Sequence, residues 1–134
     1  MLKHTSLLLA CAALTACATV PNVADVRPAG SEVTFGEAVA VADLALTPIR
    51  VTEDSRCPIN ARCVWAGRIV VETRVDGPGW RATLPMTLGE PAGTHGYVLN
   101  LVSAEPGRMA GVDADKPLAY RFSYEGNSPD RPLD

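Results

Sequence analysis

Short stretches in which apolar and polar residues alternate are the feature of this sequence that most limits its fold. In the clearest stretch, residues 68–75, Ile69, Val71 and Val75 share one side of the chain and charged residues occupy the other. Because successive side chains of a strand point to opposite faces, this alternation predicts a half-buried β-strand. Further strands are predicted at residues 33–35, 39–41, 46–51, 80–86, 97–101 and 118–124. No stretch keeps a helical period long enough to predict a helix.

The number and spacing of these strands predict the architecture. About seven short strands, separated by turns rich in Gly and Pro, are typical of an antiparallel β-sandwich or a small barrel. Pro48 lies inside one predicted strand and indicates an edge or a bulge, since proline cannot donate a ladder hydrogen bond. We therefore expect an all-β domain over residues 32–124, with most aromatic side chains in its core. Residues 125–134, rich in Pro, Gly and Asn, are expected to form a flexible tail.

The first seventeen residues indicate where the protein is delivered. Lys3 precedes an apolar run, residues 7–14, that is too short to cross a bilayer as a helix. Small residues follow it, as in a secretory signal peptide. The end of this segment, Leu14-Thr15-Ala16-Cys17, resembles the lipobox of bacterial lipoproteins. That resemblance implies cleavage after Ala16 and a diacylglyceryl group on the sulfur of Cys17. Ordinary signal cleavage after Ala18 is the alternative.

The lipoprotein resemblance sets the expected location and the first expected partner. Residues 1–16 would be removed, and residues 17–31 would form the lipidated cysteine and a proline-containing tether. Residue 18 is Ala rather than the Asp that usually retains a lipoprotein in the inner membrane. We therefore expect an envelope protein anchored to the outer membrane and facing the periplasm. The membrane is a partner through the acyl chains, each buried methylene contributing about 0.8 kcal/mol.

Removal of the leader changes the cysteine count. Of the 4 cysteines in the chain, Cys11 lies in the leader and Cys17 would carry lipid. Cys57 and Cys63 remain, and in an oxidising compartment they are expected to form a disulfide. Closing a loop of seven residues stabilises a fold by about 2 to 2.5 kcal/mol in the chain-entropy model.

The expected disulfide lies in a distinctive segment, Asp54–Gly67. Its pattern, Asp-Ser-Arg-Cys-Pro, four residues, Cys, one residue, Trp-Ala-Gly, resembles a motif of small bacterial secreted proteins and lipoproteins that are uncharacterised. The resemblance implies a β-rich domain outside the cytoplasm. It implies no particular reaction.

Two interpretations of this segment stay open. In the first, it is a rigid structural turn in which Asp54 caps the turn, Arg56 pairs with Asp54 or Glu53, and Trp65 packs over the disulfide or the core. In the second, it is a binding loop that presents Arg56 or Arg62 to a partner, as protease inhibitors present a basic residue. A preorganised loop gains affinity because less conformational freedom is lost on binding.

Composition disfavours several other functions. A net charge of −3 leaves no basic field to hold nucleic acid. Without the leader, His95 is the only histidine, and it lies in a predicted turn with no spacing that relates it to a nucleophile such as Ser55. We therefore expect no catalytic residues, no metal ligands and no cofactor. The sequence favours a non-enzymatic structural or protein-interaction lipoprotein with an unknown envelope partner, and a protease-inhibitor-like binder is the alternative.

Overall fold

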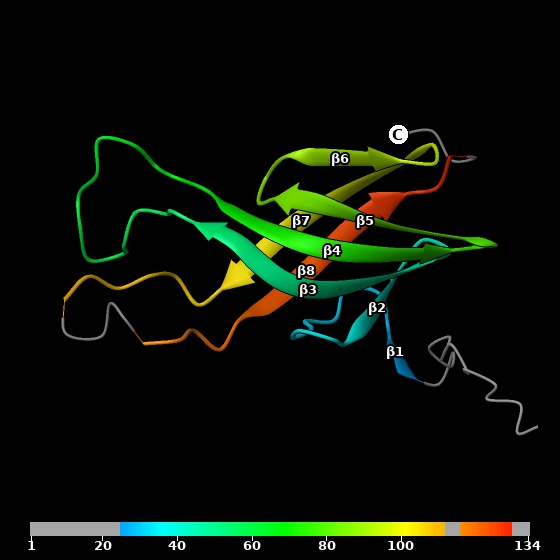
Figure 1. Ribbon diagram of the computed structural model, residues 1–134, viewed down its shortest axis with the longest axis horizontal. Coiled ribbons are helices and arrows are strands. Elements are labelled where there is room, and N and C mark those ends of the chain that lie inside the picture. Colours follow the sequence, from blue (N-terminus) through cyan, green and yellow to red (C-terminus); the bar gives the residue numbers. More distant parts are fainter. Residues whose placement is uncertain (1–24, 112–115, 130–134) are drawn as a thin grey trace, which may run out of the picture.

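The computed structural model describes residues 25–111 and 116–129, which fold into eight strands (Figure 1). The strands are β1 (Val26–Arg27), β2 (Ala38–Val41), β3 (Leu44–Asp54), β4 (Ile69–Gly77), β5 (Trp80–Thr87), β6 (Pro91–Thr94), β7 (Tyr97–Glu105) and β8 (Arg121–Asn127). One sheet has the order β1-β2-β3-β4-β5 and the other the order β6-β7-β8. The predicted all-β sandwich is confirmed, and the sheets do not close into a barrel. Within these residues no helix could span a membrane.

The hydrophobic core lies between the two sheets. The first sheet contributes the alternating residues of β4, and Ile69, Val71 and Val75 are all completely buried, as the sequence pattern predicted. The second sheet contributes Tyr97, Leu99, Leu101, Phe122 and Tyr124. Each sheet has one apolar face, and the packing of these two faces against each other removes them from water.

The core contains one buried polar pair. The hydroxyls of Thr73 on β4 and Tyr124 on β8 lie 3.0 Å apart and so join the two sheets. Burial raises the pKa of Tyr124, so the phenol stays protonated and able to donate. This bond satisfies two hydroxyls that would otherwise be costly to bury.

The ends of the domain differ from the predicted limits. Strand β8 continues to Asn127, so the tail predicted from residue 125 starts too early. Gly126 suggested a loose segment, but it pairs with Leu99, and a Cβ added to it would lie 2.6 Å from Leu99 Cδ2. The close approach of Leu99 and of the Val98 carbonyl therefore leaves little room for a side chain at this position. At the other end, β1 lies inside the predicted tether 17–31 and pairs in parallel with β2.

Two further predicted elements are corrected. Residues 91–94, which lie between two predicted strands, form β6 and pair with β7. The turn between these strands is His95-Gly96, whose φ angles of +48° and +81° suit a tight hairpin of type I′. Residues 33–35, predicted as a strand, form only a bridge between Val33 and Phe122.

Pro48 marks an irregularity, as predicted. The pairing of β3 with β4 shifts register between Pro48 and Arg50, which fits the predicted bulge. Strand β3 is central in its sheet rather than at an edge. The bulge allows a central strand to accommodate a residue that has no N–H to donate.

Candidate functional site

The segment between β3 and β4 projects from one end of the sandwich, beside the loop that follows β7 (Figure 1, green and yellow at the left). The predicted disulfide between Cys57 and Cys63 is confirmed, with 5.8 Å between the two Cα atoms. Inside the segment, the N–H of Cys57 donates to the carbonyl of Ala66 at 2.9 Å. The segment is therefore closed by both a covalent and a backbone link.

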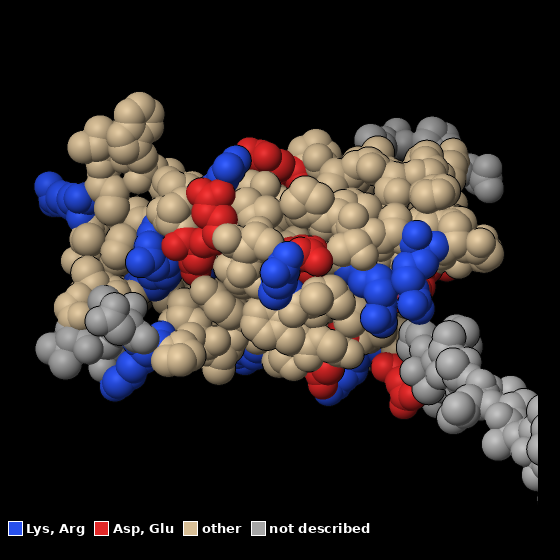
Figure 2. Space-filling view, in the orientation of Figure 1, with Lys and Arg blue, Asp and Glu red and all other residues tan. Residues whose placement is uncertain are grey.

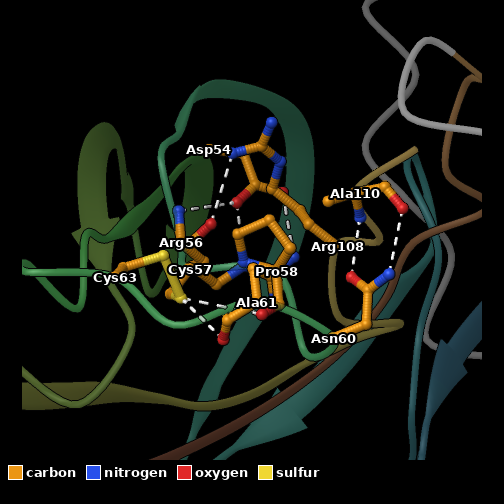
Figure 3. Close-up of a disulfide and its surroundings, with 9 residues drawn as sticks. All are labelled: Asp54, Arg56, Cys57, Pro58, Asn60, Ala61, Cys63, Arg108 and Ala110. Atoms are coloured by element: carbon orange, nitrogen blue, oxygen red, sulfur yellow. Dashed lines mark hydrogen bonds and ion pairs between the residues drawn. A yellow bond between two sulfur atoms is a disulfide. The ribbon is translucent and has the colours of Figure 1, made fainter.

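Arg56 occupies the base of this segment (Figure 3). Its guanidinium donates to both carboxylate oxygens of Asp54, Nε to Oδ1 at 2.8 Å and Nη2 to Oδ2 at 2.9 Å. It also donates to the carbonyls of Ala104 at 2.7 Å and Pro106 at 3.1 Å. The predicted pairing of Arg56 with Asp54 is confirmed. The suggestion that Arg56 is presented to a partner is wrong, because the guanidinium is committed to fixing the loop after β7 against the segment.

The electrostatics of this pair favour its charged form. Burial opposes ionisation of Asp54, but hydrogen bonds from Arg56 and Tyr120 outweigh it, so the pKa of Asp54 is lowered. The Tyr120 hydroxyl donates to Asp54 Oδ2 at 2.7 Å. Burial, and then the neighbouring carboxylate, raise the pKa of Tyr120 to about 12. At neutral pH Asp54 is therefore ionised and Tyr120 is a hydrogen-bond donor.

Replacement of Tyr120 by phenylalanine tests this arrangement through alkaline unfolding. We expect a loss of about 1 kcal/mol at pH 8, because one hydrogen bond to the carboxylate disappears. A tyrosine ionises near pH 10 in the unfolded chain and near pH 12 here, so the contribution is complete below pH 10 and is lost as the pH rises through 12. Urea unfolding should show the difference between wild type and Tyr120→Phe shrinking over that range. A constant difference would contradict the assigned bond.

A second set of bonds joins the same two loops. The side-chain amide of Asn60 donates to the carbonyl of Ala110 at 3.0 Å, and its oxygen accepts from the Ala110 N–H at 2.8 Å. The Ile59 N–H donates to the carbonyl of Arg108 at 2.9 Å. At Gly107 a Cβ would lie 2.8 Å from Ile59 Cγ2, so the loops also pack closely. We call residues 57–66 and 107–111 together the tip.

The tip exposes apolar side chains. Val64 is 93% exposed, Trp65 82%, Ile59 74% and Met109 45%, the highest values among the large apolar residues that the structure describes. The prediction that Trp65 packs over the disulfide or the core is wrong. The tip lies beyond the ends of β3 and β4, and Arg56 fills the space at its base.

Arg62 is the basic residue that stays available on the tip. It is exposed, and within residues 25–111 and 116–129 no hydrogen bond or ion pair holds it. Asp54, Arg56, Arg62 and Trp65 are the residues of this segment that a binding loop could use. Asp54 and Arg56 are largely buried, and Arg62 and Trp65 face solvent. Asn60, Arg108 and Tyr120 complete the site, and sequence reasoning missed all three as parts of it.

No family model, curated protein or solved structure matches this chain.

The residues considered for catalysis do not meet. Ser55 lies beside β4, where its hydroxyl accepts from the Arg68 N–H at 3.1 Å. His95 lies in the β6–β7 turn at the other end of the sandwich (Figure 1), where its ring stacks on Trp80 with centroids 3.8 Å apart. Among the described residues no group of three His, Cys, Asp or Glu is placed to hold a metal. Cys17, the predicted lipid attachment site, lies outside the described residues.

Proposed function

We propose that this protein is a non-enzymatic lipoprotein of the cell envelope in which the β-sandwich presents the tip as a contact surface. One observation carries the proposal: the four most exposed large apolar side chains in the described chain gather on the tip. Exposed apolar residues are normally scattered singly, and a cluster marks a site of interaction. The lipobox-like sequence ending at Cys17 supports anchoring to a membrane.

The way the tip is held supports the same role. The disulfide, the Arg56–Asp54 pair and the reciprocal Asn60–Ala110 bonds fix both loops before any contact is made. A surface fixed in advance loses little conformational freedom on binding, so more of the contact energy appears as affinity. Arg62, exposed beside Cys63, favours a protease-inhibitor-like binder as a second candidate.

A photo-crosslinking amino acid at position 64 tests the contact surface in intact envelopes. We expect a discrete adduct at position 64 that is reduced by Trp65→Ala. The matched control is position 102, an exposed valine on β7 that lies outside the tip. Equal labelling at the two positions would count against the tip. A trypsin-like protease in the adduct that disappears with Arg62→Ala would favour the inhibitor role. Separately, the intact mass of the extracted protein shows whether the lipid anchor is attached.

A further inference from the structure

We propose that the tip inserts its apolar side chains into the headgroup region of an anionic phospholipid bilayer. This inference rests on the proposed contact surface and names what the surface contacts.

The apolar side chains of the tip suit a membrane interface. Trp65 stands beside Val64, and both are almost fully solvent-exposed. An indole prefers the boundary between hydrocarbon and water, since its ring is apolar and its N–H needs a polar partner. Ile59 and Met109 are the other exposed apolar side chains of the tip, and they lie on the two loops that the Ile59–Arg108 backbone bond joins. Insertion of the tip into a bilayer interface would remove these apolar side chains from water.

The charges beside these side chains are positive. Every charged residue in the stretches 55–68 and 106–111 is an arginine. Arg56 and Arg68 are paired with Asp54 and Glu53. Among the residues that the structure describes, Arg62 and Arg108 have no carboxylate partner, and Asp113 and Asp115 lie outside that set. Figure 2 shows blue and tan surfaces, without red, at the far left end of the described molecule. Cations around an apolar surface favour anionic headgroups.

The size of the tip also favours a bilayer over a protein. A stable protein interface needs roughly 800 Å² from each partner. One indole and three aliphatic side chains supply only about 300 to 500 Å², given that a large aromatic contributes 150–250 Å². A fluid bilayer closes around a narrow projection without a complementary pocket. The rigid loops keep the apolar side chains from folding back onto the sandwich before contact.

Vesicle binding by the unacylated domain tests the inference. A chain that starts at Ala18 keeps all eight strands and every residue of the core cluster, which runs from Val33 to Tyr124, so it retains what the fold requires. Trp80→Phe leaves Trp65 as the only tryptophan, since the chain has 2. With vesicles of phosphatidylethanolamine and phosphatidylglycerol we expect a blue shift of Trp65 emission and quenching by brominated acyl chains.

Matched variants identify the surface that binds. Sedimentation with the same vesicles should show partitioning about tenfold weaker for Trp65→Ala, since a large apolar side chain no longer leaves water. Val64→Ala should weaken partitioning several-fold, whereas the same change at Val102, 43% exposed on β7, should have no effect. Arg62→Gln should weaken binding to anionic vesicles and leave binding to phosphatidylcholine unchanged.

Each other result overturns the inference in a distinct way. If the folded domain shows no emission shift, or if Val102→Ala weakens partitioning as much as Val64→Ala, the tip does not insert into lipid. A protein adduct at position 64 in envelopes together with no vesicle binding would assign the tip to a protein and leave the proposed contact surface standing. Equal labelling at positions 64 and 102 in envelopes would show that the tip is not the contact surface.

Discussion

Replacing Asp54 by alanine is expected to destabilise the protein by about 2–4 kcal/mol and to lower Tm by roughly 10 °C or more. The side chains of Asp54 and Arg56 are only 10% and 15% exposed. Without the carboxylate, the guanidinium stays largely buried against the carbonyls of Ala104 and Pro106 and loses its paired counter-charge. The Tyr120 hydroxyl loses its acceptor in the same change. Urea and thermal unfolding measure the loss directly.

The adjacent residue provides the control. Glu53 makes a comparable bond to Arg68 at 2.8 Å, but these side chains are 39% and 59% exposed. Exposed pairs contribute about 0–1 kcal/mol, because water already solvates both charges. Glu53→Ala should therefore cost no more than about 1 kcal/mol. Equal losses for Glu53→Ala and Asp54→Ala would show that burial of the Asp54 pair contributes nothing to its strength.

The pH dependence separates the charge of Asp54 from its shape. The pKa of Asp54 in the folded protein lies below its ordinary value of 3.8. Its contribution to stability is therefore complete above the unfolded pKa and is lost as the pH falls through the folded one. The difference in unfolding free energy between wild type and Asp54→Asn should be constant near neutrality and should shrink below about pH 4. A difference independent of pH would mean that the ionised form is not the stabilising one.

The sequence predicts well those features that depend on residues close together in the chain. Alternation in residues 69–75 reports which face of β4 is buried, and it is correct because a strand has only two faces. The disulfide and the Asp54–Arg56 pair are also short-range, with sequence separations of 6 and 2. When two residues are this close in the chain, the geometry of the short connection allows only a few arrangements of their side chains.

Features that depend on distant partners could not be predicted. Asn60 and Ala110 are 50 positions apart, and no local signal indicates that they meet. The sequence predicts Trp65 in the interior because tryptophan usually buries most of its surface. Burial of Trp65 depends on which residues of other segments lie next to it, and the tip extends past both sheets. Gly126 is a similar case, because glycine in a strand can reflect close packing against a distant residue, here Leu99.

Removal of the disulfide by the double change Cys57→Ser and Cys63→Ser is expected to cost about 2 to 2.5 kcal/mol, the loop-closure contribution of seven residues. The reason lies mainly in the unfolded chain, which gains conformational freedom when the loop opens. A reductant should shift the thermal unfolding of the wild type by a similar amount and leave the double variant unchanged. If the variant responds as the wild type does, the shift does not come from this bond.

Amide hydrogen exchange then distinguishes the contribution of the disulfide from that of the hydrogen bonds between the two loops of the tip. The Cys57 N–H bonds within the stapled segment, whereas the Ile59 N–H bonds to the neighbouring loop at Arg108. In the double variant, exchange at the amide of residue 57 should be at least several-fold faster than in the wild type, because that bond depends on closure of the segment. Ile59 should keep its protection, since Arg56 and Asn60 still tie the two loops. Equal loss at both amides would mean that the disulfide holds the whole tip, and vesicle binding by the variant would then fall as far as it does for Trp65→Ala.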